Sequence, residues 1–382
     1  LAAVKSNRWT AVRASIERME SILMPLSAQA KAITVHLLGH AHTDMDWMWT
    51  WDDTVKCIRR DFKIATDLMD EYPDLSFVHS QVPTYDLVRR HDPDVFAKVK
   101  KRIREGRWEN AAGTWVEGDL NMADGESIAR HMLYAKQWTR KHFDSEATAF
   151  WEPDTFGHPG NIPQLAALGE FDSYFHMRCN PGLWDNWPIR NWTGVDGSRI
   201  TTFSKVYNDT LAPDAVVETA IRNYRKGIRN ALHIWGIGNH GGGMARHQIE
   251  IMQRYHDRPL IPTIRFSSMK DVVAAVCKEK PELPANTGET YTVFEGCFTT
   301  HAAIKRYNRE CEGQLITAET LCALAGVDRR RTLANAWTPV LFNQFHDIFD
   351  GASVHDTYID AHQRSEKSFK TARKVTKEAL AL

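Results

Sequence analysis

The stretch ITVHLLGHAHTDMDWMWT, residues 33–50, carries the strongest fold signal in the chain. Its first eight residues are mainly apolar and partly β-branched, as in a buried strand, and the run stops at a polar segment. The alternation continues with apolar runs at 75–80, 108–115 and 147–151 and with amphipathic stretches at 52–71, 86–105 and 125–141. Strands separated by helices predict parallel βαβ units.

Later segments extend the same pattern and then change it. Further strands are expected at 173–177, 231–238 and 262–267, and residues 191–203 read as a hairpin whose turn is Asp196-Gly197. After a Pro- and Gly-rich connection at 278–290, the helical stretches are 302–325, 328–346 and 356–381. We therefore predict an α/β catalytic domain over residues 1–285 and a small three-helix bundle over 286–382.

Composition excludes several classes of protein. A chain of 382 residues is long enough for two or three domains, and its 48 basic and 48 acidic residues give no net charge, which argues against a nucleic-acid partner. No apolar run approaches the ~20 residues of a membrane span. Six scattered cysteines without a CxxC pair favour free thiols and a reducing compartment, so we expect a cytoplasmic protein.

Polar side chains follow the first expected strand at a spacing of two residues. His40, His42, Asp44 and Asp46 would share one face of an extended segment, where imidazole and carboxylate groups can reach one divalent ion. The alternative is a polar loop whose side chains only hydrogen-bond to one another. A single two-ligand motif does not decide between them.

Two more polar positions strengthen the metal interpretation. Asp154 follows the strand expected at 147–151, where it can act as a ligand, a nucleophile or a helix cap, although Asn161 is better placed to cap the next helix. His346 and Asp347 form a second His-Asp pair in the helical region. Together these residues offer a plausible set of two nitrogen and two oxygen ligands for a zinc-like ion.

Seven motifs in order carry a specific resemblance. They are HAHTDMDWMWT, GTWVEGDLNMADGESIARHM, WEPDTFGHPGNIPQL, WTGVDGS, GNHGGG, GCFTTHAAIKRYNRECEGQL and NQFHDIFDGAS. In order and spacing they resemble the α-mannosidases of glycoside hydrolase family 38, over about residues 32–360. The resemblance implies a zinc-dependent glycosidase that cleaves terminal α-linked mannose from oligosaccharides with retention, through a covalent mannosyl-enzyme intermediate. Together with the strand pattern, it leads us to expect a barrel-like catalytic domain of seven mainly parallel strands.

The resemblance also implies roles for individual residues. The ligands of one zinc ion per chain would be His42, Asp44, Asp154 and His346, with Asp154 also the catalytic nucleophile. Asp347, contributed by the helical bundle as His346 is, would bind substrate hydroxyls, and Trp47 and Phe156 would form an aromatic wall beside the sugar.

The sequence departs from the family pattern in two places. Many relatives have an Asp in the loop that corresponds to GIGNHGGG, residues 236–243, whereas this chain has Asn239 and His240. We predict His240 as the catalytic acid/base, with Glu117 and Asp119 as alternative proton donors. Relatives also continue past the bundle into β-sandwich domains, which are therefore expected partners of this region.

Two other functions stay open at this point. A metal-dependent carbohydrate deacetylase also places His and Asp ligands at strand ends, and a mannose-binding module could keep the metal site while losing catalytic power. The expected partner is in each case a mannoside or oligosaccharide, with no nucleic acid and no membrane, and the sequence leaves homo-oligomers open.

Overall fold

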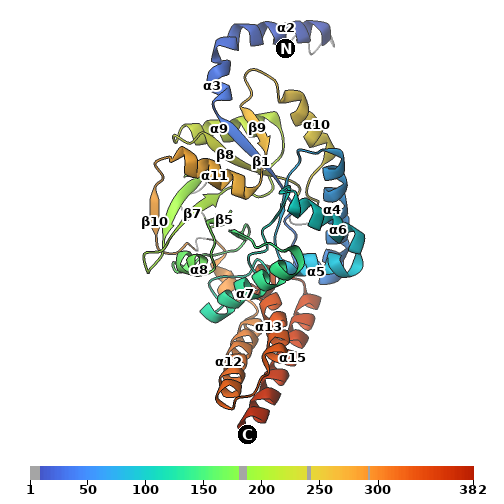
Figure 1. Ribbon diagram of the computed structural model, residues 1–382, viewed down its shortest axis with the longest axis vertical. Helices are drawn as coiled ribbons and strands as arrows, with labels where there is room; N and C mark the ends of the chain where they lie inside the picture. The colour runs from blue at the N-terminus through green and yellow to red at the C-terminus, as the bar shows by residue number, and fades with distance from the viewer. Residues whose placement is uncertain (1–8, 180–186, 239–241, 291–292) are drawn as a thin grey trace.

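The computed structural model describes residues 9–179, 187–238, 242–290 and 293–382. Figure 1 shows an α/β body that lies between helix α2 (Trp9–Leu23) at one end and a bundle of long helices at the other. The body contains two sheets whose strands are short and mostly buried. Most of the candidate site residues lie in loops that follow these strands, and His346 and Asp347 lie in a short helix next to the bundle.

The first sheet is parallel and is built around the strand predicted from residues 33–40. Its strands are β1 (Thr34–His40), β2 (Phe77–His79), β3 (Trp108–Asn110), β8 (Asn230–Trp235) and β9 (Thr263–Phe266). The order is β3-β2-β1-β8, and β9 also pairs with β1. Strand β1 is buried over six of its seven residues, as its continuous apolar sequence requires in a parallel sheet covered on both faces.

The second sheet is mixed. Its strands are β4 (Ala149–Glu152), β5 (Ser173–His176), β6 (Ile189–Thr193), β7 (Arg199–Ser204) and β10 (Ala285–Thr287), in the order β10-β6-β7-β5-β4. Strands β6 and β7 form the antiparallel hairpin that we predicted, and Gly197 at its turn has a φ of 88°, a conformation that favours glycine. All other pairs in this sheet are parallel.

The predicted α/β class is confirmed, but the seven-stranded barrel is not. Within the described ranges the strands pair as two five-stranded sheets, and neither sheet closes on itself. The short β3 ends at Asn110 and pairs only with β2, while β4 pairs only with β5. Local sequence patterns gave the strands but not this break between β3 and β4, because strand pairing is a long-range property.

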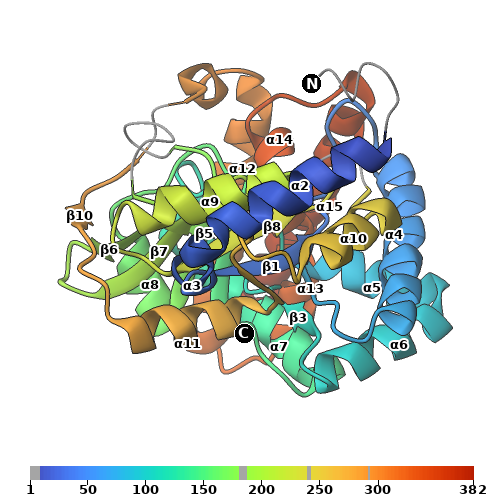
Figure 2. The ribbon, with the colours of Figure 1, turned by 90° about the horizontal axis from the view of Figure 1, so that it is seen from above.

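Helices cover both sheets. The helices of the body are α3 (Ser27–Lys31), α4 (Trp51–Glu71), α5 (Val82–His91), α6 (Pro93–Arg104), α7 (Gly125–Phe143), α8 (Ile162–Leu168), α9 (Pro213–Tyr224), α10 (Arg246–Tyr255) and α11 (Met269–Glu279). Figure 2 shows α4, α5 and α6 on one flank of the first sheet and α11 on another side. An aromatic core lies beneath α4 and α5, where the Trp108 indole N–H donates to Tyr85 Oη at 2.9 Å.

The bundle confirms the three predicted helical segments. It consists of α12 (Ala302–Leu324), α13 (Arg330–Asn343) and α15 (His355–Leu380), around a core that includes Leu315, Trp337 and Val375. The segment predicted at 328–346 is divided, because α13 ends at Asn343 and His346 begins the short helix α14 (His346–Phe349). This break turns His346 toward the α/β body.

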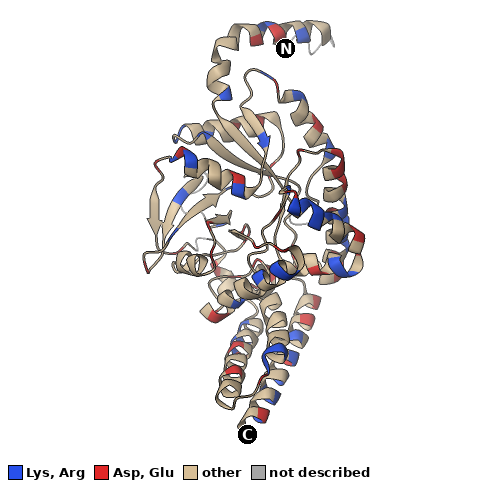
Figure 3. Ribbon diagram, viewed as in Figure 1, with Lys and Arg blue, Asp and Glu red and all other residues tan. Residues whose placement is uncertain are grey.

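The surface and the thiols agree with the composition. Figure 3 shows acidic and basic residues interspersed along the helices. In the described part of the chain, no helix is both long and apolar enough to cross a bilayer. None of the six cysteines, which all lie within the described residues, forms a disulfide.

Candidate metal centre and active site

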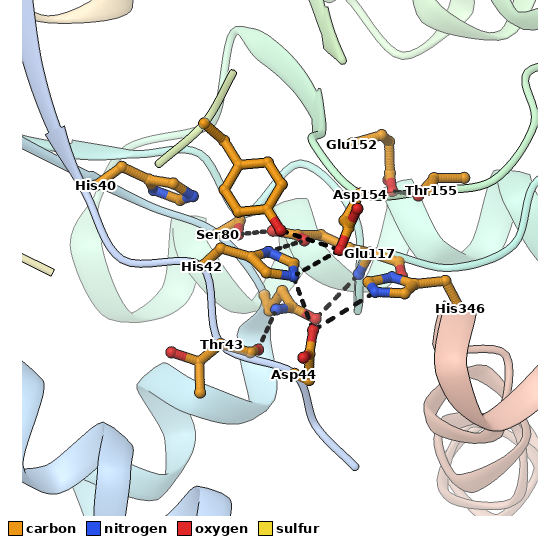
Figure 4. A network of polar contacts seen from close by, with 12 residues as sticks. His40, His42, Thr43, Asp44, Ser80, Glu117, Glu152, Asp154, Thr155 and His346 are labelled. Carbon is orange, nitrogen blue, oxygen red and sulfur yellow. Dashed lines mark hydrogen bonds and ion pairs between the residues drawn. The ribbon is translucent and has the colours of Figure 1, made fainter. Parts of the chain in front are cut away.

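Four buried side chains converge between the α/β body and the bundle. His42 and Asp44 lie in the loop after β1, Asp154 lies just after β4, and His346 begins α14. Each offers one ligand atom, and these atoms all lie within 4.8 Å of one another. Figure 4 shows the four side chains pointing toward a common centre. The structure thus brings together the four ligands expected from the sequence.

Both histidines present Nε2 to this centre. His42 Nδ1 lies 2.9 Å from the Glu117 carboxylate, and His346 Nδ1 lies 2.8 Å from the Glu117 carbonyl oxygen. Because these oxygens only accept hydrogen bonds, the ring proton belongs on Nδ1 in both residues. The His346 contact is a hydrogen bond, whereas the His42 contact is an ion pair whose two atoms do not meet hydrogen-bond geometry. In a neutral ring the lone pair then belongs to Nε2, which is the form that binds metal.

The spacing at the centre requires positive charge. His42 Nε2 lies 2.8 Å from Asp44 Oδ1 and 3.7 Å from Asp154 Oδ2. His346 Nε2 lies 3.6 Å from Asp44 Oδ1, and this buried atom has no hydrogen-bond partner among the described residues. A lone pair directed at a carboxylate at these distances is repulsive unless a proton or a cation lies between them.

The pKa values of these side chains also show that the centre favours positive charge. Burial alone would lower the pKa of His42, but the Glu117 and Asp44 carboxylates raise it well above its ordinary value. Burial would also lower the pKa of His346, but Asp347 and Asp44 raise it to about 9. Burial would raise the pKa of Asp44, but the two histidines lower it to about 2. The pocket therefore attracts positive charge, and two imidazole nitrogens with two carboxylates are donors that suit zinc.

Asp154 has two partners that our sequence reasoning missed. The Arg178 guanidinium donates to Asp154 Oδ1, and the Tyr207 hydroxyl donates to Asp154 Oδ2 at 3.1 Å. Arg178 and Tyr207 follow β5 and β7, so the rule that ligand-binding residues lie at the carboxyl ends of strands would have identified both. Together they hold both oxygens of the Asp154 carboxylate, Arg178 at Oδ1 and Tyr207 at Oδ2, the oxygen that also faces His42.

Two buried histidines hold the backbone of Arg178. His176 Nδ1 and His158 Nε2 donate to the Arg178 carbonyl oxygen at 2.8 and 3.3 Å. Their other nitrogens accept, from Arg190 at 2.9 Å and from the Tyr174 hydroxyl at 2.6 Å. Since Arg donates only, the tautomer of His176 is fixed, and Arg178 is held rigidly beside Asp154.

Comparison with known families assigns the chain. The family model of the glycosyl hydrolases family 38 N-terminal domain matches residues 32–296, and that of the alpha mannosidase middle domain matches residues 292–382. The chain belongs to glycoside hydrolase family 38. Both matched segments contribute to the metal centre, the first with three ligands and the second with His346.

Curated relatives in family 38 are longer than this chain. The chain is 29% identical to human alpha-mannosidase 2C1 over 334 residues, which is 84% of this chain and 32% of the relative. It is 28% identical to a Saccharomyces cerevisiae alpha-mannosidase over 365 residues, which is 89% of this chain and 34% of the relative. The chain thus spans about a third of the length of these relatives.

Solved structures agree on the fold. An alpha-mannosidase from Enterococcus faecalis V583 superposes with a TM-score of 0.81 at 20% identity, over 91% of this chain and 42% of that chain. A 4-alpha-glucanotransferase from Thermococcus litoralis superposes with a TM-score of 0.59 at 11% identity, over 89% of this chain and 59% of that chain. At these identities the likeness concerns the fold alone.

Two of the residues that the family 38 resemblance assigned to substrate, Asp347 and Phe156, lie beside His346. Asp347 is almost fully buried, with Oδ2 3.6 Å from His346 Nε2, and burial raises its pKa to about 8. The Phe156 ring lies 5.3 Å from the His346 ring. Trp47 is half-buried in the loop that follows Asp44, and its ring contacts that of Trp49.

Not every polar residue after β1 belongs to the centre. His40 Nδ1 bonds to the Val78 carbonyl at 3.0 Å, and burial lowers the pKa of His40 to about 4. Asp46 accepts from Thr357 of α15 at 3.3 Å. The even spacing from 40 to 46 therefore did not place all four side chains at one ion, because the segment after β1 is a loop rather than an extended strand.

The proton donors weighed in the sequence have different surroundings. Glu117 is fully buried, and its two oxygens form an ion pair with His42 and a hydrogen bond with Ser80. Asp119 is buried beside Asp350. Burial raises the pKa of both carboxyls, and the Asp119 charge adds to the rise at Asp350. His240 lies outside the described residues, so its role stays a prediction.

Proposed function

We propose that this chain is the catalytic region of a zinc-dependent retaining glycoside hydrolase that removes terminal α-linked mannose from oligosaccharides or glycans. The observation that carries the proposal is the buried set of His42, Asp44, Asp154 and His346, in which one carboxylate is also oriented by Arg178 and Tyr207. Donors that hold both oxygens of a carboxylate suit a metal ligand and also a nucleophile that must meet an anomeric carbon, so the arrangement supports both roles of Asp154.

In this proposal each of the chain's site residues has a separate role. When bound, zinc would orient sugar hydroxyls and act as a Lewis acid. Asp154, aligned by Arg178 and Tyr207, attacks the anomeric carbon as the glycosidic bond breaks and the leaving oxygen takes a proton from the acid/base group. The same group then deprotonates a water that hydrolyses the mannosyl ester and frees Asp154. Asp347 binds a hydroxyl of the same sugar. A retaining glycosidase also needs an acid/base group about 5 Å from the nucleophile, on the opposite face of the sugar. We assign this role to His240, and we assign the aromatic contacts to Trp47 and Phe156.

Covalent trapping tests the proposal directly. A 2-deoxy-2-fluoro or 5-fluoro mannosyl fluoride forms a slowly hydrolysed ester with the nucleophile, and peptide mapping locates it. The expected label is on Asp154, one per chain, and D154N should take up none. A label on Asp44 or Glu117 would contradict the assignment.

Product and metal analyses separate the alternatives. A deacetylase leaves the glycosidic bond intact, and a mannose-binding module binds an aryl α-mannoside without turnover, so mass spectrometry of the products distinguishes both from a mannosidase. Elemental analysis should give one zinc per chain. Zinc far below one per chain after zinc loading would contradict the proposed centre.

Three further points belong to the proposal. The division expected between residues 285 and 286 falls within β10, which pairs with β6, so we place the boundary between the catalytic domain and the bundle after Thr287. The length of the relatives supports β-sandwich domains as partners of this region, and the six cysteines without a disulfide support a cytoplasmic location.

A further inference from the structure

Glu117 contacts both histidines of the metal centre without being one of its ligands. It lies in the segment that follows β3, and its side chain is fully buried. Its carboxylate is 2.9 Å from His42 Nδ1, while its carbonyl oxygen is 2.8 Å from His346 Nδ1 and also accepts from the His346 backbone N–H at 3.2 Å. Figure 4 shows Glu117 among these groups. One residue thus joins two ligands that are 304 positions apart in the sequence.

We propose that Glu117 is a positioning residue that orients both histidine ligands, His42 through its carboxylate and His346 through its carbonyl. The inference rests on the proposed zinc-dependent function. A histidine that binds metal usually donates its other ring N–H to a carboxylate or a carbonyl, which fixes its tautomer and ring orientation. Here a single residue supplies both kinds of acceptor.

Glu117 is itself held from two sides. The Ser80 hydroxyl donates to its second carboxylate oxygen. Its backbone N–H donates to Gln81 Oε1 at 3.1 Å, and Gln81 Nε2 donates to the Thr43 carbonyl at 3.2 Å. Since Thr43 lies between His42 and Asp44, Gln81 fixes the position of Glu117 relative to the ligand loop itself.

Gln81 holds this place in a costly conformation. Its φ is 67°, in the left-handed region that a residue with a side chain seldom adopts, and the side chain is buried. Ser80 and Gln81 directly follow β2, so the end of one strand secures the loop after β1 and the loop after β3 together. The arrangement also explains why Glu117 is a poor candidate for proton transfer to substrate, because both of its oxygens are already engaged.

Zinc affinity tests the proposal in the folded full chain. The variants are E117Q, which keeps the shape but loses the charge, and E117A, which also removes the acceptor. The matched control is E152Q, because Glu152 is equally buried nearby but bonds to Thr114 and Thr155 rather than to a histidine ligand. Competition with a chromophoric chelator gives the zinc Kd of each protein.

We expect E117Q to weaken zinc binding about 10-fold and E117A up to about 100-fold, as for other residues behind metal-binding histidines. E152Q should stay within about threefold of wild type. In the cobalt-substituted protein, the visible absorption bands should shift in E117Q and not in E152Q, a change that a purely structural role would not produce.

The outcomes separate this inference from the proposed function. A wild-type chain that binds no zinc contradicts the proposed function. A wild-type chain that binds zinc, together with an E117Q variant of unchanged Kd and unchanged cobalt spectrum, overturns the role of Glu117 alone. If E117A does not fold, as judged by circular dichroism, the isosteric E117Q decides the question.

Discussion

Tyr207 is the residue whose contribution can be isolated most cleanly. Its hydroxyl donates to Asp154 at 3.1 Å, while its ring packs against the His42 ring at 4.7 Å. Y207F removes the first contact and keeps the second. Because a hydrogen bond to a charged group contributes about 1.5–3 kcal/mol, kcat for an aryl α-mannoside should fall about 10- to 100-fold.

Zinc content serves as the internal control for Y207F, since Tyr207 is not a ligand and the variant should retain one zinc per chain. A Y207F protein with wild-type kcat would show that the hydroxyl does not act on the nucleophile. A protein that loses its zinc would show that the ring rather than the hydroxyl matters.

Residue roles were predictable only where a motif is local. His42 and Asp44 stand two apart and His346 adjoins Asp347, so short segments indicate metal chemistry. Arg178 and Tyr207 reach Asp154 across 24 and 53 positions. Their places after β5 and β7 mark them as candidates for the site, but no local motif indicates that they contact Asp154. Glu117 was a candidate proton donor by its residue type, and only the three-dimensional contacts show that its carboxylate faces a histidine.

Strand β3 and helix α11 meet at the buried carboxylate of Glu109. Glu109 of β3 accepts from the Met269 and Lys270 backbone N–H groups at the start of α11. Burial outweighs these bonds and raises the pKa of Glu109 from 4.5 to about 7. Below pH 4.5 Glu109 is protonated in both folded and unfolded chains, and above pH 7 it is ionised in both.

Between pH 4.5 and about 7, Glu109 is protonated in the folded chain and ionised in the unfolded chain. Glu109 therefore makes the free energy of unfolding fall as the pH rises. From pH 5 to 8 the free energy of unfolding of the wild type should fall by up to about 3 kcal/mol more than that of E109Q, because the Gln side chain does not titrate. Urea unfolding of both proteins at the two pH values measures the difference. Equal pH dependence in the two proteins would show that Glu109 titrates normally in the folded chain.

The sequence predicted most helices and strands correctly, but not how the strands pair into sheets. The apolar run of β1, the hairpin turn at Gly197 and the three bundle helices each have a local cause in the sequence. Strand β10 has only three residues, Ala285–Thr287, and lies within a Pro- and Gly-rich stretch, so no pattern marked it. The pairing of β10 with β6 joins residues almost a hundred positions apart in the sequence, so a local sequence pattern cannot predict it.

In the whole molecule, the metal centre joins the α/β body to the bundle. The backbone of 117–119 pairs with 344–346 through the Gly118–Phe345 bridge and through the Asp119 N–H to the Gln344 carbonyl at 2.9 Å. An ion held by ligands from both parts should therefore stabilise the folded chain. At free zinc about 1,000 times its Kd, the stabilisation would be about 4 kcal/mol.

We expect a strong chelator to lower the Tm by several degrees and zinc to restore it, as measured by differential scanning calorimetry. H346A removes the ligand from the bundle side and should show no zinc-dependent shift. A zinc-containing protein whose Tm is insensitive to chelation would contradict a stabilising role of the ion.

The division of the ligands between two matched segments limits how such chains can be inherited. Residues 32–296 contain His42, Asp44 and Asp154, whereas His346 falls within 292–382. A gene rearrangement that transferred only the first segment would carry three of the candidate ligands together with Glu117, and would leave the fourth, His346, behind. Recombination can therefore preserve the metal centre only by moving both segments together, so the evolutionary unit is larger than either domain.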